Sequence, residues 1–171
     1  MTSDHAVALS FASAADLPRV GLGARLRADD PNLLELARSL APRAHAARAA
    51  ARTRGIEVVA WNEPAFPAAL LTLTDLPPAL WYLGHLDALD DPTVAIVGSR
   101  AASAVALETA RSIASDLASR GITVVSGLAR GVDSAAHRGA METGRTAAVL
   151  GSGVDRVYPP EHAPLAAEIL S

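Results

Sequence analysis

Two arginines stand in glycine-containing turns, a combination of residues that is suited to binding phosphate. Glycine lets the backbone approach a ligand closely, helix N-termini present free amides with a partial positive charge, and a guanidinium can hold phosphate bidentately. We interpret three such turns as candidate anion-binding sites. Their residues are Gly98, Ser99 and Arg100 in the first turn, Ser126, Gly127, Arg130 and Gly131 in the second, and Gly151 and Ser152 in the third.

Each turn follows a short apolar run of β-strand character and precedes a segment of helical composition. A repeated order of strand, glycine turn and helix predicts a parallel sheet with crossover helices, in an α/β domain. The carboxyl ends of parallel strands meet at one edge of the sheet, where ligands bind. We therefore expect the three turns to gather there. The predicted strands are residues 93–97, 122–125 and 146–150.

Local signals define the first helix of this repeat. Ser103 is a suitable N-cap, and Gly121 is a suitable residue to end the helix. The strand before it, at 93–97, lacks alternation, which is typical of a strand covered on both faces. The apolar face of the helix is expected to contain Ala106, Ala110, Ile113 and Leu117.

The chain divides into three segments by composition. Residues 1–54 are predicted to form a small helical domain, with a turn between helices at 16–23 and a helix that begins at Asp30-Pro31. Residues 55–91, rich in proline and aromatic residues, are expected to be a connector that packs on the edge of the main sheet. Residues 92–171 form the α/β domain. A stretch at 36–56 is basic and has no acidic residue, which indicates either a solvated helix face or an auxiliary nucleic-acid contact.

Composition limits the chemistry that is available. The 171 residues, half of them hydrophobic, contain no cysteine, and all 15 basic residues are arginine, so any phosphate clamp is a guanidinium. There is no run long enough to span a membrane and no secretory start, so we expect a cytoplasmic protein. A sheet of three parallel strands leaves an edge that needs cover. We therefore expect the sequence to be part of a longer protein.

The turns do not match the common nucleotide-binding motifs. No P-loop pattern is present, and Gly98 is not followed by the spaced glycines of a dinucleotide fingerprint. His137 lies four positions after Asp133, on one face of a predicted helix; this pair is either a structural contact, which we favour, or a general acid and base. Further metal ligands at suitable spacing are lacking. We expect no catalytic residue, no metal and no cofactor.

Three ordered motifs carry a resemblance to a known family. AIVGSR at 95–100, VVSGLARGVDSAAHRGAM at 124–141 and AVLGSGVDRVYPPEH at 148–162 resemble the DNA-processing protein A family, and the similarity extends over about residues 56–171. It implies a Rossmann-like three-layer domain with a parallel sheet. The helical segment at 1–54 is compatible with the small SAM-like domain that many members carry in front.

The resemblance implies a bacterial protein that binds single-stranded DNA during natural transformation, protects it and helps to load the RecA recombinase. Such proteins are not known as enzymes, need no metal or nucleotide, and form a homodimer as full-length proteins. By similarity, Ser99 and Arg100 contact the DNA backbone, and the turn at 126–131 lines the same groove with Arg130 as a second positive group. The third turn is expected to contribute Gly151 and Ser152.

The sequence departs from the family pattern at two places. Many members have a basic residue where Pro160 stands here, and their sheet continues past residue 171 with an Arg-Asn-Arg motif. Tyr158 is the one aromatic residue near the turns, so phosphate contacts are expected to dominate binding. One alternative is a nucleotide-processing enzyme similar to Rossmann-like phosphoribohydrolases, although their Pro-Gly-Gly-x-Gly-Thr stretch is absent. Another is an interaction module that dimerises through its sheet edge.

Overall fold

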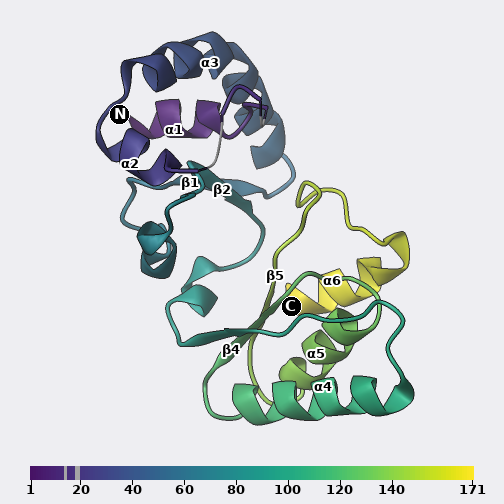
Figure 1. Ribbon diagram of the computed structural model, residues 1–171. Coiled ribbons are helices and arrows are strands. Elements are labelled where there is room, and N and C mark those ends of the chain that lie inside the picture. Colours follow the sequence, from purple (N-terminus) through teal and green to yellow (C-terminus); the bar gives the residue numbers. More distant parts are fainter. Residues whose placement is uncertain (14, 18–19) are drawn as a thin grey trace. The chain divides into compact units, whose positions relative to one another are not determined.

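The computed structural model describes residues 1–13, 15–17 and 20–171 (Figure 1). Its contacts group the chain into two compact units, Met1–Leu83 and Gly84–Ser171. The predicted turn at 16–23 lies partly outside the described residues. Each unit is built around its own apolar core.

The first unit combines helices with a pair of antiparallel strands. Its helices are α1 (Ser3–Leu9), α2 (Leu22–Arg27) and α3 (Pro31–Arg52), and its strands are β1 (Glu57–Ala60) and β2 (Ala79–Tyr82), with a short 3-10 helix η1 (Ala68–Thr72) between them. The helix α1 packs against α3 and β1, and its last four residues are buried. The Asp30 side chain accepts a hydrogen bond from the Asn32 amide at 2.9 Å, and Pro31 occupies the first turn. The predicted start of this helix is confirmed.

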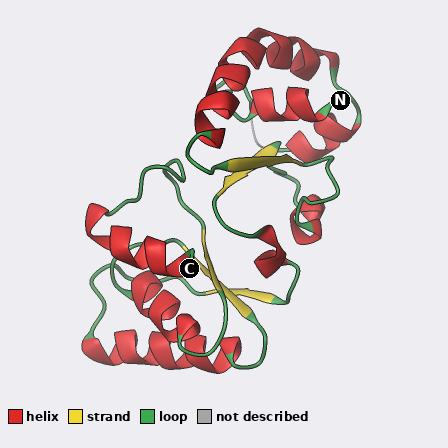
Figure 2. Ribbon diagram, turned by 180° about the vertical axis from the view of Figure 1, so that it is seen from behind, coloured by secondary structure: helices red, strands yellow, loops and turns green. Residues whose placement is uncertain are grey.

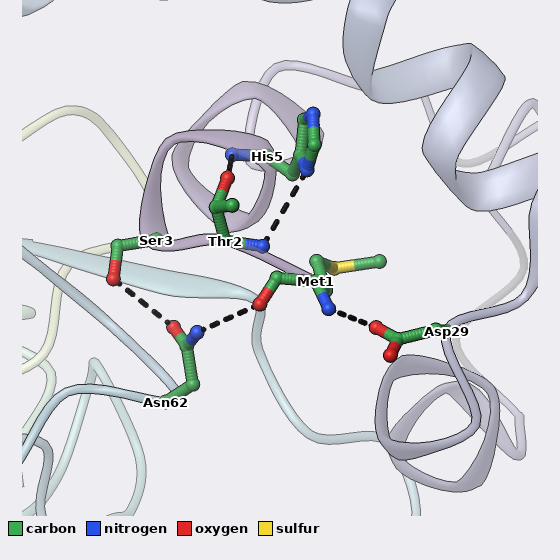
Figure 3. Close-up of polar contacts among 6 residues, drawn as sticks. All are labelled: Met1, Thr2, Ser3, His5, Asp29 and Asn62. Atoms are coloured by element: carbon green, nitrogen blue, oxygen red, sulfur yellow. Dashed lines mark hydrogen bonds and ion pairs between the residues drawn. The ribbon is translucent and has the colours of Figure 1, made fainter.

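Polar contacts fix the start of α1 within the same unit (Figure 3). The Thr2 hydroxyl accepts from the His5 amide at 3.3 Å, while His5 Nδ1 accepts from the Thr2 amide at 3.4 Å, which completes a capping box. The Asn62 amide nitrogen donates to the Met1 carbonyl at 3.1 Å. The Met1 amino group pairs with Asp29. These bonds connect the first turn of α1 to the loops after α2 and β1.

The second unit has the predicted α/β architecture. Three parallel strands stand in the order β3-β4-β5 with the helices α4 and α5 as crossovers, which confirms the Rossmann-like topology. A short 3-10 helix η2 precedes the sheet, and η3 and the helix α6 follow it. The bounds are η2 Leu86–Leu89, β3 Thr93–Ala95, α4 Ala104–Ala118, β4 Thr123–Ser126, α5 Val132–Met141, β5 Thr146–Ala148, η3 Pro160–His162 and α6 Ala163–Ile169.

Small side chains form the core between the sheet and its crossover helices. Successive right-handed crossovers place α4 and α5 on one face of the sheet, and the two helices lie side by side (Figures 1 and 2). A Cβ atom at Gly139 would lie 2.1 Å from the Arg111 carbonyl oxygen, so the backbones of α4 and α5 approach closely only because residue 139 is glycine. The core residues are Ala114, Ala118, Val124, Ala136 and Ala140.

The predicted apolar face of α4 is confirmed in part, because Ala110 is buried and Leu117 packs against the core. The buried residues are Ala110, Ala114 and Ala118, whereas Ala106 is exposed and Ile113 is 49% exposed. The close approach to α5 explains the difference, because it admits a stripe of alanines and excludes a branched side chain. Local capping was predicted correctly: the Ser103 hydroxyl accepts from the Ala106 amide, and Gly121 has a φ of 75°.

The prediction that the first strand is covered on both faces was also wrong. β3 is exposed along its whole length, and Val97, directly after it, is 73% exposed. β3 lies at an edge of the sheet, where β4 is its only strand neighbour within the described residues. All three strands are also short, with three or four residues each.

The stretch predicted as a connector is divided between the two units. The strands β1 and β2 pair with each other and belong to the first unit with α1 and α3. The helix η2 belongs to the second unit and contacts β5, an edge strand of the main sheet. Beside it, Arg145 lies 3.5 Å from Asp87 and 3.7 Å from Asp91. The division at 54/55 and 91/92 remains a prediction.

Candidate nucleic-acid interface

A cleft of about 250 Å³ lies where the three glycine turns meet, at the carboxyl edge of the parallel sheet. It receives residues from all three turns and from the segment before η3, so the predicted gathering of the turns is confirmed. Its lining residues are Arg100, Gly127, Ala129, Arg130, Leu150, Gly151, Ser152, Tyr158 and Pro159.

The first and second turns are in direct contact with each other. The Val132 amide donates to the Ser99 carbonyl at 3.2 Å. Gly131 has a φ of 79°, and a Cβ atom there would lie 2.2 Å from the Ser99 carbonyl oxygen. A Cβ atom at Gly98 would lie 2.8 Å from Cγ2 of Val132. These two glycines therefore let the turns pack together, a role that the structure shows independently of any ligand.

Arg100 is the cation of this cleft that has no partner. Its side chain is exposed and lines the cleft, and within the described residues no carboxylate forms an ion pair with it. The hydroxyl of Ser99 accepts from the Ala101 amide at 3.1 Å, which orders the backbone on both sides of Arg100. A positive charge is thus held at the end of β3 with its hydrogen-bond donors available to an anion.

Arg130, in contrast to Arg100, already forms an ion pair, with Glu161. Oε1 of Glu161 accepts from Nε of Arg130 at 2.5 Å and also pairs with Nη2. Its own backbone amide and the Arg130 guanidinium lower the pKa of Glu161 below its usual value, so the carboxylate stays ionised at neutral pH. About half of each side chain is exposed. The second arginine predicted to bind DNA is therefore neutralised by a neighbour.

Asp133 supports the second turn from behind. Its Oδ2 accepts from the Gly127 amide at 3.1 Å and from the Ala129 amide at 3.4 Å. Between these amides, the buried Leu128 has a φ of 60°, and its carbonyl accepts from His162 Nδ1 at 2.8 Å. The turn is rigidly held, but the amides that a free anion would need are used by the protein itself.

Other predicted site residues lie in different surroundings. Ser126 is buried, and its hydroxyl donates to the Ile96 carbonyl at 2.6 Å, which ties β4 to the end of β3. The Ser152 hydroxyl donates to the Arg156 carbonyl at 2.7 Å within its own loop. Gly151 lines the cleft, and a Cβ atom there would meet nothing within 4 Å. Ser126 thus stabilises the pairing of β3 and β4, while the third turn forms part of the cleft wall.

His137 is a structural residue rather than half of an acid and base pair. The Thr146 hydroxyl donates to the Val124 carbonyl at 2.7 Å, so it accepts from Nδ1–H of His137, also at 2.7 Å. Nε2 is then an unprotonated nitrogen, and it is buried without a partner. Burial lowers the pKa of His137 to about 4, although Asp133 opposes the shift. Among the described residues, no group of three or more His, Asp or Glu is arranged to hold a metal.

Sequence reasoning did not identify the residues that contact Arg130 and the turn that carries it. Glu161 and His162 stand in the Pro-Pro-Glu-His segment and reach the second turn from about 30 positions away. The motif is visible in the sequence, but its contacts depend on the fold. Tyr158, singled out as a stacking residue, is 62% exposed and lines the cleft.

The fold and the site define a class of protein: a Rossmann-like α/β unit with an arginine-bearing cleft at the carboxyl edge of its sheet. Residues 57–171 match the family described as DNA recombination-mediator protein A, and the chain belongs to this family. The resemblance inferred from the three motifs is confirmed.

Individual relatives agree with this assignment. The chain is 45% identical to protein Smf of Escherichia coli over 61% of its own length and 28% of that protein, and 42% identical to DNA processing protein DprA of Streptococcus pneumoniae over 55% and 33%. The chain thus spans no more than about a third of these two relatives.

Solved structures show the same fold. DNA processing protein A from Streptococcus pneumoniae matches with a TM-score of 0.72 and 26% identity, over 99% of this chain and 64% of that one. The Helicobacter pylori protein, described for its single-stranded DNA binding mode, matches with a TM-score of 0.56 and 28% identity, over 67% and 51%. No helix in the described part of the chain is long and apolar enough to cross a membrane.

Proposed function

We propose that this chain binds single-stranded DNA through its backbone phosphates, in the cleft at the carboxyl edge of the sheet. The observation that carries the proposal is the unpaired Arg100 guanidinium in that cleft. The hydrogen bond from the Ala101 amide to the Ser99 hydroxyl orders the backbone that carries Arg100. The Helicobacter pylori relative, whose description names single-stranded DNA binding, supports the same choice of ligand.

Phosphate contacts give binding that is independent of base sequence and sensitive to salt. The exposed ring of Tyr158 can add one stacked base, which favours an unpaired strand over a duplex. Because the formal net charge of the chain is −3, long-range attraction is weak, and affinity depends on the local charge of the cleft. Ser99 and the second and third turns complete the proposed contact surface.

The wider role is proposed from the family. The whole protein would act in the cytoplasm, protect DNA during transformation and recombination, load RecA, and work as a homodimer without catalysing a reaction. Two observations on α5 support the absence of catalysis: Asp133 accepts hydrogen bonds from backbone amides, and His137 is fully buried. The RecA contact and the dimer are proposed for the whole protein, because the chain matches no more than about a third of the two relatives named above.

The proposal is tested by fluorescence anisotropy with a labelled oligo-dT strand at two salt concentrations, beside the matching duplex. Arg100→Ala is expected to weaken single-strand binding by about 10- to 100-fold, the value of one charged hydrogen-bonded contact. The control is Arg120→Ala, which removes the same charge from an exposed residue at the opposite end of β4. Equal affinities of parent, Arg100→Ala and Arg120→Ala would overturn the proposed site, and no binding by the folded parent would overturn the function.

A further inference from the structure

We propose that Glu161 limits the affinity of the cleft for DNA by competing with phosphate for Arg130. The inference rests on the proposed function and concerns the same cleft. In this account Glu161 sets how many cationic groups are available to the strand: Arg100 at all times, and Arg130 only when a phosphate replaces the carboxylate.

The geometry of the pair supports competition. A guanidinium has five N–H donors, and Glu161 uses the edge formed by Nε and Nη2. This is one of the edges with which arginine holds a phosphate bidentately. A phosphate that approaches Arg130 therefore finds that edge occupied, and it also meets the negative charge of the carboxylate.

The structure positions Glu161 from both sides. Pro159, two residues before it, is buried, and the His162 amide donates to the Pro159 carbonyl at 3.0 Å. The His162 ring in turn donates to the carbonyl of Leu128, two residues before Arg130. The segment that carries Glu161 is thus bonded to the turn that carries Arg130. The pair is a consequence of this docking and not a chance contact between two mobile side chains.

The strength of the pair is suited to exchange. Both side chains are about half exposed, and exposed ion pairs contribute no more than about 1 kcal/mol. A strand already held by Arg100 presents its next phosphates in the same cleft at high effective concentration. Such a strand can displace Glu161, at a cost that lowers its affinity by up to about fivefold.

The chain contains a matched control for this pair. Oε1 of Glu142 accepts from Nε of Arg111 at 2.6 Å and pairs with Nη2, in the same arrangement as the pair in the cleft. Neither Arg111 nor Glu142 lines the cleft. Glu161→Gln and Glu142→Gln therefore make the same change in net charge and release the same type of guanidinium at two different places.

The test measures oligo-dT affinity of the parent, Glu161→Gln and Glu142→Gln over a range of salt concentrations. Glu161→Gln is expected to bind up to about fivefold more tightly, because no carboxylate has to be displaced from Arg130. Glu142→Gln is expected to bind as the parent does. In an Arg130→Ala background, Glu161→Gln should give a smaller gain in affinity, because no guanidinium is left for it to release.

Two results would overturn the inference while the proposed function stands. One is a parent that binds DNA with a Glu161→Gln variant of equal or weaker affinity, which would show that Glu161 is neutral or orients Arg130 for binding. The other is an equal gain for Glu142→Gln, which would assign the effect to net charge alone. A folded parent that does not bind would instead contradict the proposed function itself.

Discussion

The first and second glycine turns each contain an arginine and follow neighbouring strands, yet they differ in which polar groups are free to bind a ligand. In the first turn, Arg100 lines the cleft and forms no ion pair within the part of the chain that the structure describes. In the second turn, Asp133 takes two amides and Glu161 takes the guanidinium of Arg130. A glycine turn with an arginine is therefore not by itself an anion site. The available charge depends on which groups the rest of the fold has already used.

The largest effect is expected where the two turns meet. Gly131→Ala should destabilise the second unit by about 3–5 kcal/mol, because the residue has a φ of 79° and its new Cβ would lie 2.2 Å from the Ser99 carbonyl oxygen. Gly151→Ala is the control, since its Cβ meets nothing within 4 Å, and it should change stability by less than about 0.5 kcal/mol. Urea denaturation measures both. Equal stability of the two variants would show that the turns do not depend on this contact.

Acid should destabilise the helix that supports the second turn. The unfolded chain takes up a proton at His137 near its ordinary pKa of 6.5, whereas the folded protein does so only near a pKa of about 4. The unfolded state therefore binds more protons in this window, and stability falls as the pH falls through it, by up to about 3 kcal/mol.

Urea denaturation between pH 7 and pH 4.5 measures this loss. A His137→Gln variant should show a smaller dependence on pH over the same window, and His45→Gln, an exposed histidine of the first unit, should keep the dependence of the parent. A parent whose second unit is equally stable at pH 7 and pH 4.5 would contradict the burial of a neutral imidazole.

A smaller loss of stability is expected when the second turn alone is weakened. Asp133→Asn should cost about 2 kcal/mol, because a charged acceptor of two amide hydrogen bonds is lost. Hydrogen exchange should accelerate at the amides of Gly127 and Ala129 and stay unchanged at Ala101 in the first turn. The control Asp116→Asn lies on an exposed part of α4 and should leave all three rates unchanged. Uniform acceleration in both turns would show that they are held as one body.

Local features of the fold were predictable from the sequence. The Asp30 and Ser103 caps, the positive φ of Gly121 and the order of strand, turn and helix depend on residues that are close in the chain. The gathering of the three turns followed from the parallel sheet. These predictions succeeded because each rests on short-range geometry or on a general rule of sheet topology.

Features that depend on distant neighbours could not be predicted. The buried face of α4 is decided by its contact with Gly139 on α5. The pair of Arg130 with Glu161 joins residues 31 positions apart. Motif spacing places both arginines at one edge, but it carries no information on which of them a carboxylate neutralises.

The most direct test compares the DNA affinities of variants in which either the free arginine or the paired arginine is replaced by glutamine. Arg100→Gln removes the unpaired cation, whereas Arg130→Gln with Glu161→Gln removes the ion pair and leaves the net charge of the chain unchanged. Anisotropy titration with oligo-dT should show a loss of about 10- to 100-fold for Arg100→Gln. The double variant should lose less affinity than Arg100→Gln, because the cost of displacing Glu161 offsets part of the Arg130–phosphate contact in the parent. A loss for the double variant as large as that for Arg100→Gln would contradict the account.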